Sequence, residues 1–151
     1  MTLSTVSHDT FVIERSYDAP VAQVYEAWAE PKLKARWFAG SAEALGAGYD
    51  LDFRVGGREA FSGGPPGGTV HTFESRYHDI VPEQRIVYTY EMYADEARIS
   101  VSVTTVEFRR AGAGTLLVLT EQGVFLDGND TPAIREKGTG ELLDALGTAL
   151  G

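Results

Sequence analysis

The chain has 151 residues, a hydrophobic fraction of 43% and a formal net charge of −9 at pH 7. This length predicts a single domain over residues 1–151 that is large enough to bury a core. The absence of cysteine excludes a disulfide scaffold, thiol catalysis and cysteine metal sites, and the acidic charge disfavours nucleic acid and anionic membranes as partners.

The first residues of the chain are not expected to form a targeting segment. The first ten residues, MTLSTVSHDT, lack the basic start and apolar run of a signal peptide. No apolar run approaches the ~20 residues that are needed to cross a bilayer. Because the chain also lacks cysteine, which suits a reducing compartment, we expect a cytoplasmic protein.

One strand and two short helices are expected before residue 40. Residues 11–16 alternate between two faces and predict a strand. Asp18 is placed to cap a helix over residues 20–29, which carries one apolar stripe. Pro31 opens a second helix, and its basic side chains are interpreted as a solvated face rather than a docking patch: Lys32, Lys34 and Arg36.

From residue 49 the apolar residues recur with a period of two, which is typical of strands. Glycine and proline predict a loop over residues 63–68. Strands that are neighbours in the sequence are expected to pair, which predicts one antiparallel sheet of about seven strands. Besides the first strand, its members are expected over residues 49–55, 58–62, 69–81, 85–93, 98–109 and 115–122.

The strand over residues 98–109 does not keep one apolar phase. Ile99, Val101 and Val103 share a face, whereas the later apolar residues lie on the other one. Since an extra residue in a strand reverses the faces that follow it, a bulge is expected near Thr104.

The last segment, residues 132–150, is the longest run with a helical pattern. Thr131 can cap its first turn, and Pro132 suits the first helical position. A stripe of leucines at helical spacing needs an apolar cover, and the strands supply one. The sequence therefore predicts an α+β fold in which a curved sheet wraps around a C-terminal helix with Leu142, Leu143, Leu146 and Leu150 facing inward.

Five motifs in order resemble the SRPBCC (START-like, helix-grip) superfamily, in the branch named after the C-terminal domain of the activator of the heat-shock-protein-90 ATPase. They are a strand-to-helix opening with an Ala-Pro pair, a second helix with an aromatic exit, a glycine-pair hairpin, a second hairpin with an aromatic strand, and the last strand. They occupy residues 17–28, 30–38, 53–58, 81–90 and 114–119.

The resemblance implies a cavity between sheet and helix that takes hydrophobic or amphipathic small molecules, and it implies no particular reaction. One departure concerns the last helix, where the family often has a Gly-Trp pair and this chain has Gly138-Thr139, followed by Gly140. Two glycines lower helix propensity by roughly 1 kcal/mol each, so a looser or kinked start is expected. The missing tryptophan is expected to leave room in the core or to shift its packing.

Aromatic side chains on inward faces suit a cavity, although each one alone fits an ordinary core position as well. Tyr88 and Tyr90 share an inward face, and a buried hydroxyl needs a partner. The histidines have no metal-site spacing, and no cofactor is expected. The expected ligand-cavity residues are Trp37, Phe53, Phe61, Phe73, Tyr88, Tyr90, Phe108, Phe125, Thr139, Leu142 and Leu146.

Glu59 and His71 are the only candidates for catalytic work. If Phe61 pairs with Thr69 across the glycine-proline loop, Glu59 lies opposite His71, because paired positions in an antiparallel ladder keep a constant sum. Opposite residues on one face are close enough for carboxylate and imidazole to meet. Such a pair could act as an acid–base couple in the cavity, or it could simply reach water at the cavity mouth.

The sequence favours binding of a small hydrophobic or amphipathic ligand without catalysis. Two alternatives remain open: a co-chaperone-like module with a chaperone partner, and a cyclase- or hydrolase-like enzyme that uses polar groups in the cavity. An open cavity would favour ligand binding or catalysis over the module. Val12, Val87 and Tyr93 lie opposite the expected core, and together they would form a patch that suits a homodimer.

Overall fold

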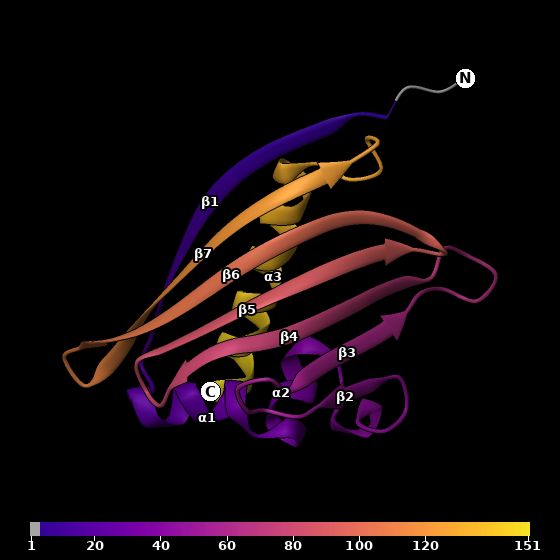
Figure 1. The fold of residues 1–151 in the computed structure, drawn as a ribbon. Coiled ribbons are helices and arrows are strands. Elements are labelled where there is room, and N and C mark those ends of the chain that lie inside the picture. Colours follow the sequence, from indigo (N-terminus) through magenta and orange to yellow (C-terminus); the bar gives the residue numbers. More distant parts are fainter. Residues whose placement is uncertain (1–3) are drawn as a thin grey trace.

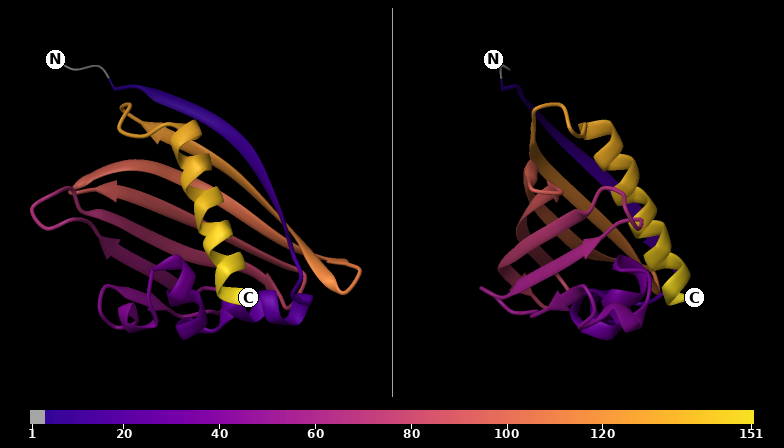
Figure 2. Two further views of the ribbon diagram at one scale, coloured as in Figure 1. Left: turned by 180° about the vertical axis from the view of Figure 1, so that it is seen from behind. Right: turned by 90° about the vertical axis from the view of Figure 1, so that its right-hand side faces the viewer.

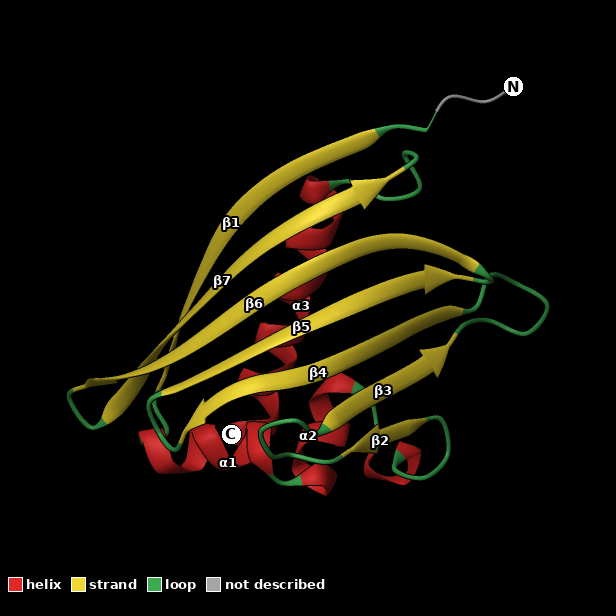
Figure 3. Ribbon diagram, in the orientation of Figure 1, coloured by secondary structure: helices red, strands yellow, loops and turns green. Residues whose placement is uncertain are grey.

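The computed structural model describes residues 4–151 as one curved sheet with helices on its concave side (Figures 1 and 3). The element order predicted from the sequence is confirmed, with one added 3-10 turn, η1. The elements are β1 (Val6–Tyr17), α1 (Val21–Ala29), α2 (Pro31–Phe38), η1 (Ala42–Ala44), β2 (Tyr49–Leu51), β3 (Arg58–Gly63), β4 (His71–Val81), β5 (Arg85–Ala94), β6 (Ala97–Ala111), β7 (Gly114–Leu126) and α3 (Pro132–Leu150).

The sheet has seven strands in the order β1-β7-β6-β5-β4-β3-β2, and every neighbouring pair is antiparallel. Only the β1–β7 pair joins strands that are far apart in the chain. The sheet curves around α3, while α1 and α2 lie at one end of the concave side near the C-terminus of α3 (Figure 2). This architecture confirms the predicted α+β helix-grip class. Within residues 4–151, no helix is long and apolar enough to cross a membrane.

The helix α3 is held to the sheet by its leucines. Leu143 and Leu146 are fully buried, whereas Leu142 and Leu150 are half-buried. The Thr131 hydroxyl accepts a hydrogen bond from the Ile134 N–H at 3.2 Å, as expected for the cap. The helix is continuous from Pro132 to Leu150, so the expected loosening at its glycines does not interrupt it.

Two local predictions in the first part of the chain, between residues 18 and 55, are wrong. Asp18 does not cap α1, because Pro20 occupies the cap position and its carbonyl accepts the first helical bond from Val24. The strand expected over residues 49–55 ends at Leu51. The chain turns after it, with the Gly57 N–H bonded to the carbonyl of residue 54, which leaves Val55 exposed.

The bulge in β6 lies at Ile99 and not near Thr104. Met92 pairs with Ser100 and Tyr93 with Arg98, so Ile99 is the extra residue. From Ser100 onward the strand alternates without a break. Its inward positions are therefore Ser100, Ser102, Thr104, Val106 and Phe108, all of them buried, whereas Val101 and Val103 face outward.

The buried face of β6 differs from the expected one for a physical reason. Three successive inward positions of β6 are occupied by hydroxyl side chains, which an apolar pattern assigns to solvent. Ser100 and Thr104 are nevertheless buried because each has a charged side chain as hydrogen-bond partner inside the molecule, Arg135 and Glu121 respectively.

Candidate functional site

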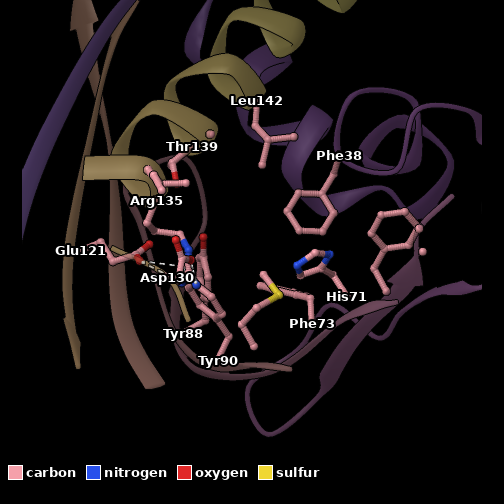
Figure 4. A pocket seen from close by; sticks show the side chains of 16 residues that line it. Phe38, His71, Phe73, Tyr88, Tyr90, Glu121, Asp130, Arg135, Thr139 and Leu142 are labelled. Atoms are coloured by element: carbon pink, nitrogen blue, oxygen red, sulfur yellow. Dashed lines mark hydrogen bonds and ion pairs between the residues drawn. The ribbon is translucent and has the colours of Figure 1, made fainter. Parts of the chain in front are cut away.

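A cavity of about 540 Å³ lies between α3 and the concave face of the sheet. Side chains from α2, β3, β4, β5, β7 and α3 line it, so its walls come from almost the whole chain. Figure 4 shows an apolar side and a polar side. The apolar side holds Phe38, Phe61, Phe73, Met92 and Leu142, with the imidazole of His71 beside Phe38 and Phe73, and the polar side holds Tyr88, Tyr90, Glu121, Asp130, Arg135 and Thr139.

Arg135 organises the polar side. It projects from the first turns of α3 and is 92% buried, since only 8% of its surface is exposed. Its Nη1 donates to the Tyr90 hydroxyl at 2.8 Å, and its Nη2 donates to Ser100 Oγ and Asp130 Oδ2, also at 2.8 Å. The guanidinium carbon lies 5.2 Å from the centre of the Phe125 ring, a cation–π geometry.

Two carboxylates neutralise this arginine. Glu121 Oε2 lies 3.8 Å from Arg135 Nη1 and accepts a hydrogen bond from Tyr90 at 2.7 Å. Glu121 Oε1 accepts one from Thr104 at 3.2 Å. Burial raises the pKa of Glu121, while the Tyr90 hydrogen bond and the Arg135 charge act against that shift. The second carboxylate, Asp130, accepts from Arg135 through Oδ2 and from the Thr131 N–H through Oδ1.

Tyr88, like Thr139, lies on the polar side outside the network of Arg135 and the two carboxylates. Its side chain lines the cavity and is 6% exposed. Burial raises the pKa of Tyr88, and the nearby Glu121 charge adds to that effect, whereas the hydroxyl of Thr104 opposes it. Thr104 donates its own hydroxyl proton to Glu121 at 3.2 Å, so it can only accept from Tyr88. The Tyr88 hydroxyl is therefore a buried donor on the cavity wall.

Six of the residues expected in the cavity line it: Phe61, Phe73, Tyr88, Tyr90, Thr139 and Leu142. Sequence reasoning missed Phe38, Met92, Glu121, Asp130 and Arg135. The signal that could have found the last three is the row of hydroxyl side chains on β6, because buried hydroxyls at alternate positions imply charged or polar partners on the facing helix and strand.

The other five expected residues pack in the core instead. Trp37 lies against Trp28, with ring centres 4.8 Å apart, and its Nε1 donates to a backbone carbonyl. Phe53 contacts Tyr77, with ring centres 5.0 Å apart. The remaining three are buried outside the cavity lining, behind the arginine or among the leucines: Phe108, Phe125 and Leu146.

The predicted Glu59–His71 pair is wrong because the β3–β4 register differs from the expected one. Phe61 pairs with Phe73, so Glu59 lies opposite Ser75, and His71 pairs with Gly63. The loop is longer than expected because Val70 bonds elsewhere: its N–H donates to Asp95 Oδ1 at 2.9 Å and its carbonyl accepts from the Asp95 N–H. His71 is exposed and lines the cavity, whereas Glu59 does not.

Glu59 belongs to a second buried cluster. It forms an ion pair with Lys34, whose Nζ lies 2.8 Å from Oε2, and it accepts hydrogen bonds from Tyr49 and Tyr77. The prediction of a solvated Lys34 is therefore wrong, since only 1% of this residue is exposed. Its ammonium lies 4.6 Å from the centre of the Phe38 ring. Burial lowers the pKa of Lys34, and the Glu59 charge opposes that shift.

These features define a helix-grip, or SRPBCC, protein with an internal cavity. The chain belongs to the family described as Activator of Hsp90 ATPase homolog 1-like protein, whose model matches residues 18–151.

Solved structures agree with this assignment. A protein from Rhizobium leguminosarum is 45% identical, with 99% of this chain and 98% of the other covered and a TM-score of 0.92. The Mll3558 protein from Rhizobium loti is 41% identical, with 96% and 99% covered and a TM-score of 0.89. CalU16 from Micromonospora echinospora is 22% identical, with 99% and 87% covered and a TM-score of 0.63, a likeness of fold alone. A search of curated proteins finds no match.

Proposed function

We propose that the protein binds a small hydrophobic or amphipathic molecule in the cavity between the sheet and α3. The observation that supports this function is the cavity itself. Its volume of about 540 Å³ lies within the ~300–1,000 Å³ of small-molecule sites. Such sites are mostly apolar with a few convergent polar groups, and this cavity has an aromatic side and one polar cluster.

Two matched tryptophan variants test this proposal. Thr139 lines the cavity on α3, whereas Lys137 is exposed on the same helix. A panel of fatty acids, flavonoids and polyketide-like aromatics is screened for compounds that raise the melting temperature, because a ligand of the folded state stabilises it. Thr139→Trp should abolish such shifts by filling the cavity, and Lys137→Trp should retain them. Equal shifts in both variants would contradict the proposed site.

The other two readings of the sequence have less support. A surface module of co-chaperone type, the activity named in the family description, has no need of an open cavity. Catalysis by Glu59 and His71 would need the two side chains together, and the register separates them. Glu121 lines the cavity, but both of its oxygens already accept hydrogen bonds. If no compound of the panel raised the melting temperature, the surface module would become the better proposal.

A further inference from the structure

The chemistry of the ligand follows from which hydrogen-bonding groups the polar side of the cavity leaves free. Both carboxylates there are occupied: Glu121 accepts from Tyr90 and Thr104, and Asp130 accepts from Arg135 and a backbone N–H. Arg135 donates through both terminal nitrogens to three oxygen partners. The acceptors of this cluster are therefore used by the protein's own donors.

Two uncharged side chains of the polar side keep a hydroxyl group that can donate to a ligand. Both Tyr88 and Thr139 line the cavity. The neighbour that the Tyr88 hydroxyl has within residues 4–151 is the Thr104 hydroxyl, whose own proton goes to Glu121, so the Tyr88 proton is left for a ligand or water. Tyr88 is 94% buried, with 6% of its surface exposed, and its ring lies 6.2 Å from that of Tyr90. Figure 4 shows both tyrosines at the polar side, with Thr139 projecting from the helix above them. A buried hydroxyl without a partner costs stability unless water or a ligand accepts its proton.

The charges at this side disfavour an ionic ligand group. One guanidinium faces two carboxylates, which give a net charge of −1 when all three are ionised, or zero when Glu121 holds a proton. An anion would approach both carboxylates and would find Arg135 already neutralised by Asp130 at 2.8 Å and Glu121 at 3.8 Å. A cation would have to compete with Arg135 for oxygens that already accept hydrogen bonds.

We infer that the ligand is a ring-bearing apolar molecule whose polar group is an uncharged hydrogen-bond acceptor, such as a ketone oxygen, and that the Tyr88 hydroxyl donates to this group. The inference rests on the proposed function. The apolar body packs against Phe38 and Phe73, whose rings lie 5.1 Å apart, while the acceptor displaces the water that would otherwise solvate Tyr88. Arg135 is a positioning residue that holds Tyr90 and the start of α3 in place.

Four probes with the same biphenyl body test this inference by calorimetric titration. They are para-acetylbiphenyl, the hydrocarbon para-ethylbiphenyl, biphenyl para-carboxylate and para-phenylbenzylammonium. The readout is the ratio of the Kd of the hydrocarbon to that of the ketone, which isolates the acceptor oxygen. In Tyr88→Phe this ratio should fall roughly fivefold, the value of one neutral hydrogen bond. Tyr93→Phe, which removes a hydroxyl on the same strand outside the cavity, should leave the ratio unchanged.

Each other outcome overturns a defined part of the account. If the ketone and the hydrocarbon bind but Tyr88→Phe leaves the ratio unchanged, the inference is wrong and the proposed function stands. If the carboxylate or the ammonium probe binds more tightly than the ketone, the cavity accepts a charged group and the inference is also wrong. If none of the four probes binds the wild-type protein at its solubility limit, the proposed function fails together with the inference.

Discussion

Two ionic clusters are buried within residues 4–151, and they differ in what surrounds them. Lys34 and Glu59 are enclosed on all sides, with 1% of each residue exposed, between α2 and the strands β2–β4. Arg135 and Glu121 lie between α3 and the strands β5–β7, on the wall of a cavity. The first cluster has only protein groups as neighbours and fixes α2 on the sheet. The second has one face toward free space, where a ligand can reach it.

This difference shows that a buried charge by itself does not indicate a functional site. Both clusters combine an ion pair with tyrosine hydroxyls, and both perturb pKa values. What separates them is a neighbouring cavity and donors that the protein itself leaves free. The following predictions, from the largest effect to the smallest, test this contrast.

The enclosed cluster should give the largest loss of stability. Lys34→Met leaves Glu59 buried without its counter-ion, so the free energy of unfolding should fall by about 3–5 kcal/mol. Urea denaturation followed by circular dichroism measures this loss. Lys32→Met, an exposed lysine on the same helix, is the control and should change stability by less than about 0.5 kcal/mol. Equal effects in the two variants would mean that the ion pair is not a structural element.

Two leucines of α3, one in the core and one at the cavity, should also differ in their effect on stability. Leu146 is fully buried against the core, so Leu146→Ala should cost about 2–5 kcal/mol of unfolding free energy. Leu142 is half-buried and borders the cavity, where truncation removes fewer packing contacts, and Leu142→Ala should cost less. A cost for Leu146→Ala under about 0.5 kcal/mol would contradict the grip of the sheet on the helix.

Removing the hydroxyl group should affect the stability of the protein differently at the two tyrosines of the polar side. The Tyr90 hydroxyl donates to Glu121 and accepts from Arg135, so Tyr90→Phe should destabilise by roughly 1–3 kcal/mol. Tyr88→Phe removes a hydroxyl with no such partner, and the change should stay within about 0.5 kcal/mol. Thermal unfolding of both variants without ligand measures the contrast. A loss in Tyr88→Phe as large as in Tyr90→Phe would show that its hydroxyl is bonded within the protein.

The smallest expected effect is a pH dependence. Burial raises the pKa of Glu121 in the folded state, so the folded protein holds this proton to higher pH than the unfolded chain does. Its contribution to stability is therefore present at low pH and is lost as pH rises through the folded pKa. Glu121→Gln removes this titration, and its stability relative to wild type should rise with pH above the ordinary glutamate range. Parallel curves for the two proteins would contradict the raised pKa.

The sequence predicted the architecture well because local signals defined it. The cap at Thr131, the leucine spacing in α3 and the alternation in β5 each depend on neighbouring residues alone. The β3–β4 register could not be predicted, since it depends on the contact of Val70 with Asp95, a residue 25 positions away.

The charged residues on the polar side of the cavity were missed for a related reason. The inward hydroxyls of β6 look solvated until Arg135 and Glu121 are placed opposite them. Likewise, Lys34 looks exposed on an isolated helix, and only the folded sheet brings Glu59 within 2.8 Å of it. These residues are buried, contrary to expectation, because each has a partner that is distant in the sequence. Composition and periodicity contain no information on such pairs.

The most direct test of the account is the position of a bound ligand. Methyl NMR on the full chain with para-acetylbiphenyl should show intermolecular nuclear Overhauser effects to Met92 and Leu142, which line the cavity on opposite walls. The exposed methyl groups of Val12 and Val55 should show none. If the contacts appear at the exposed valines instead, or if no contact reaches Met92 and Leu142, the cavity is not the binding site and the central claim is wrong.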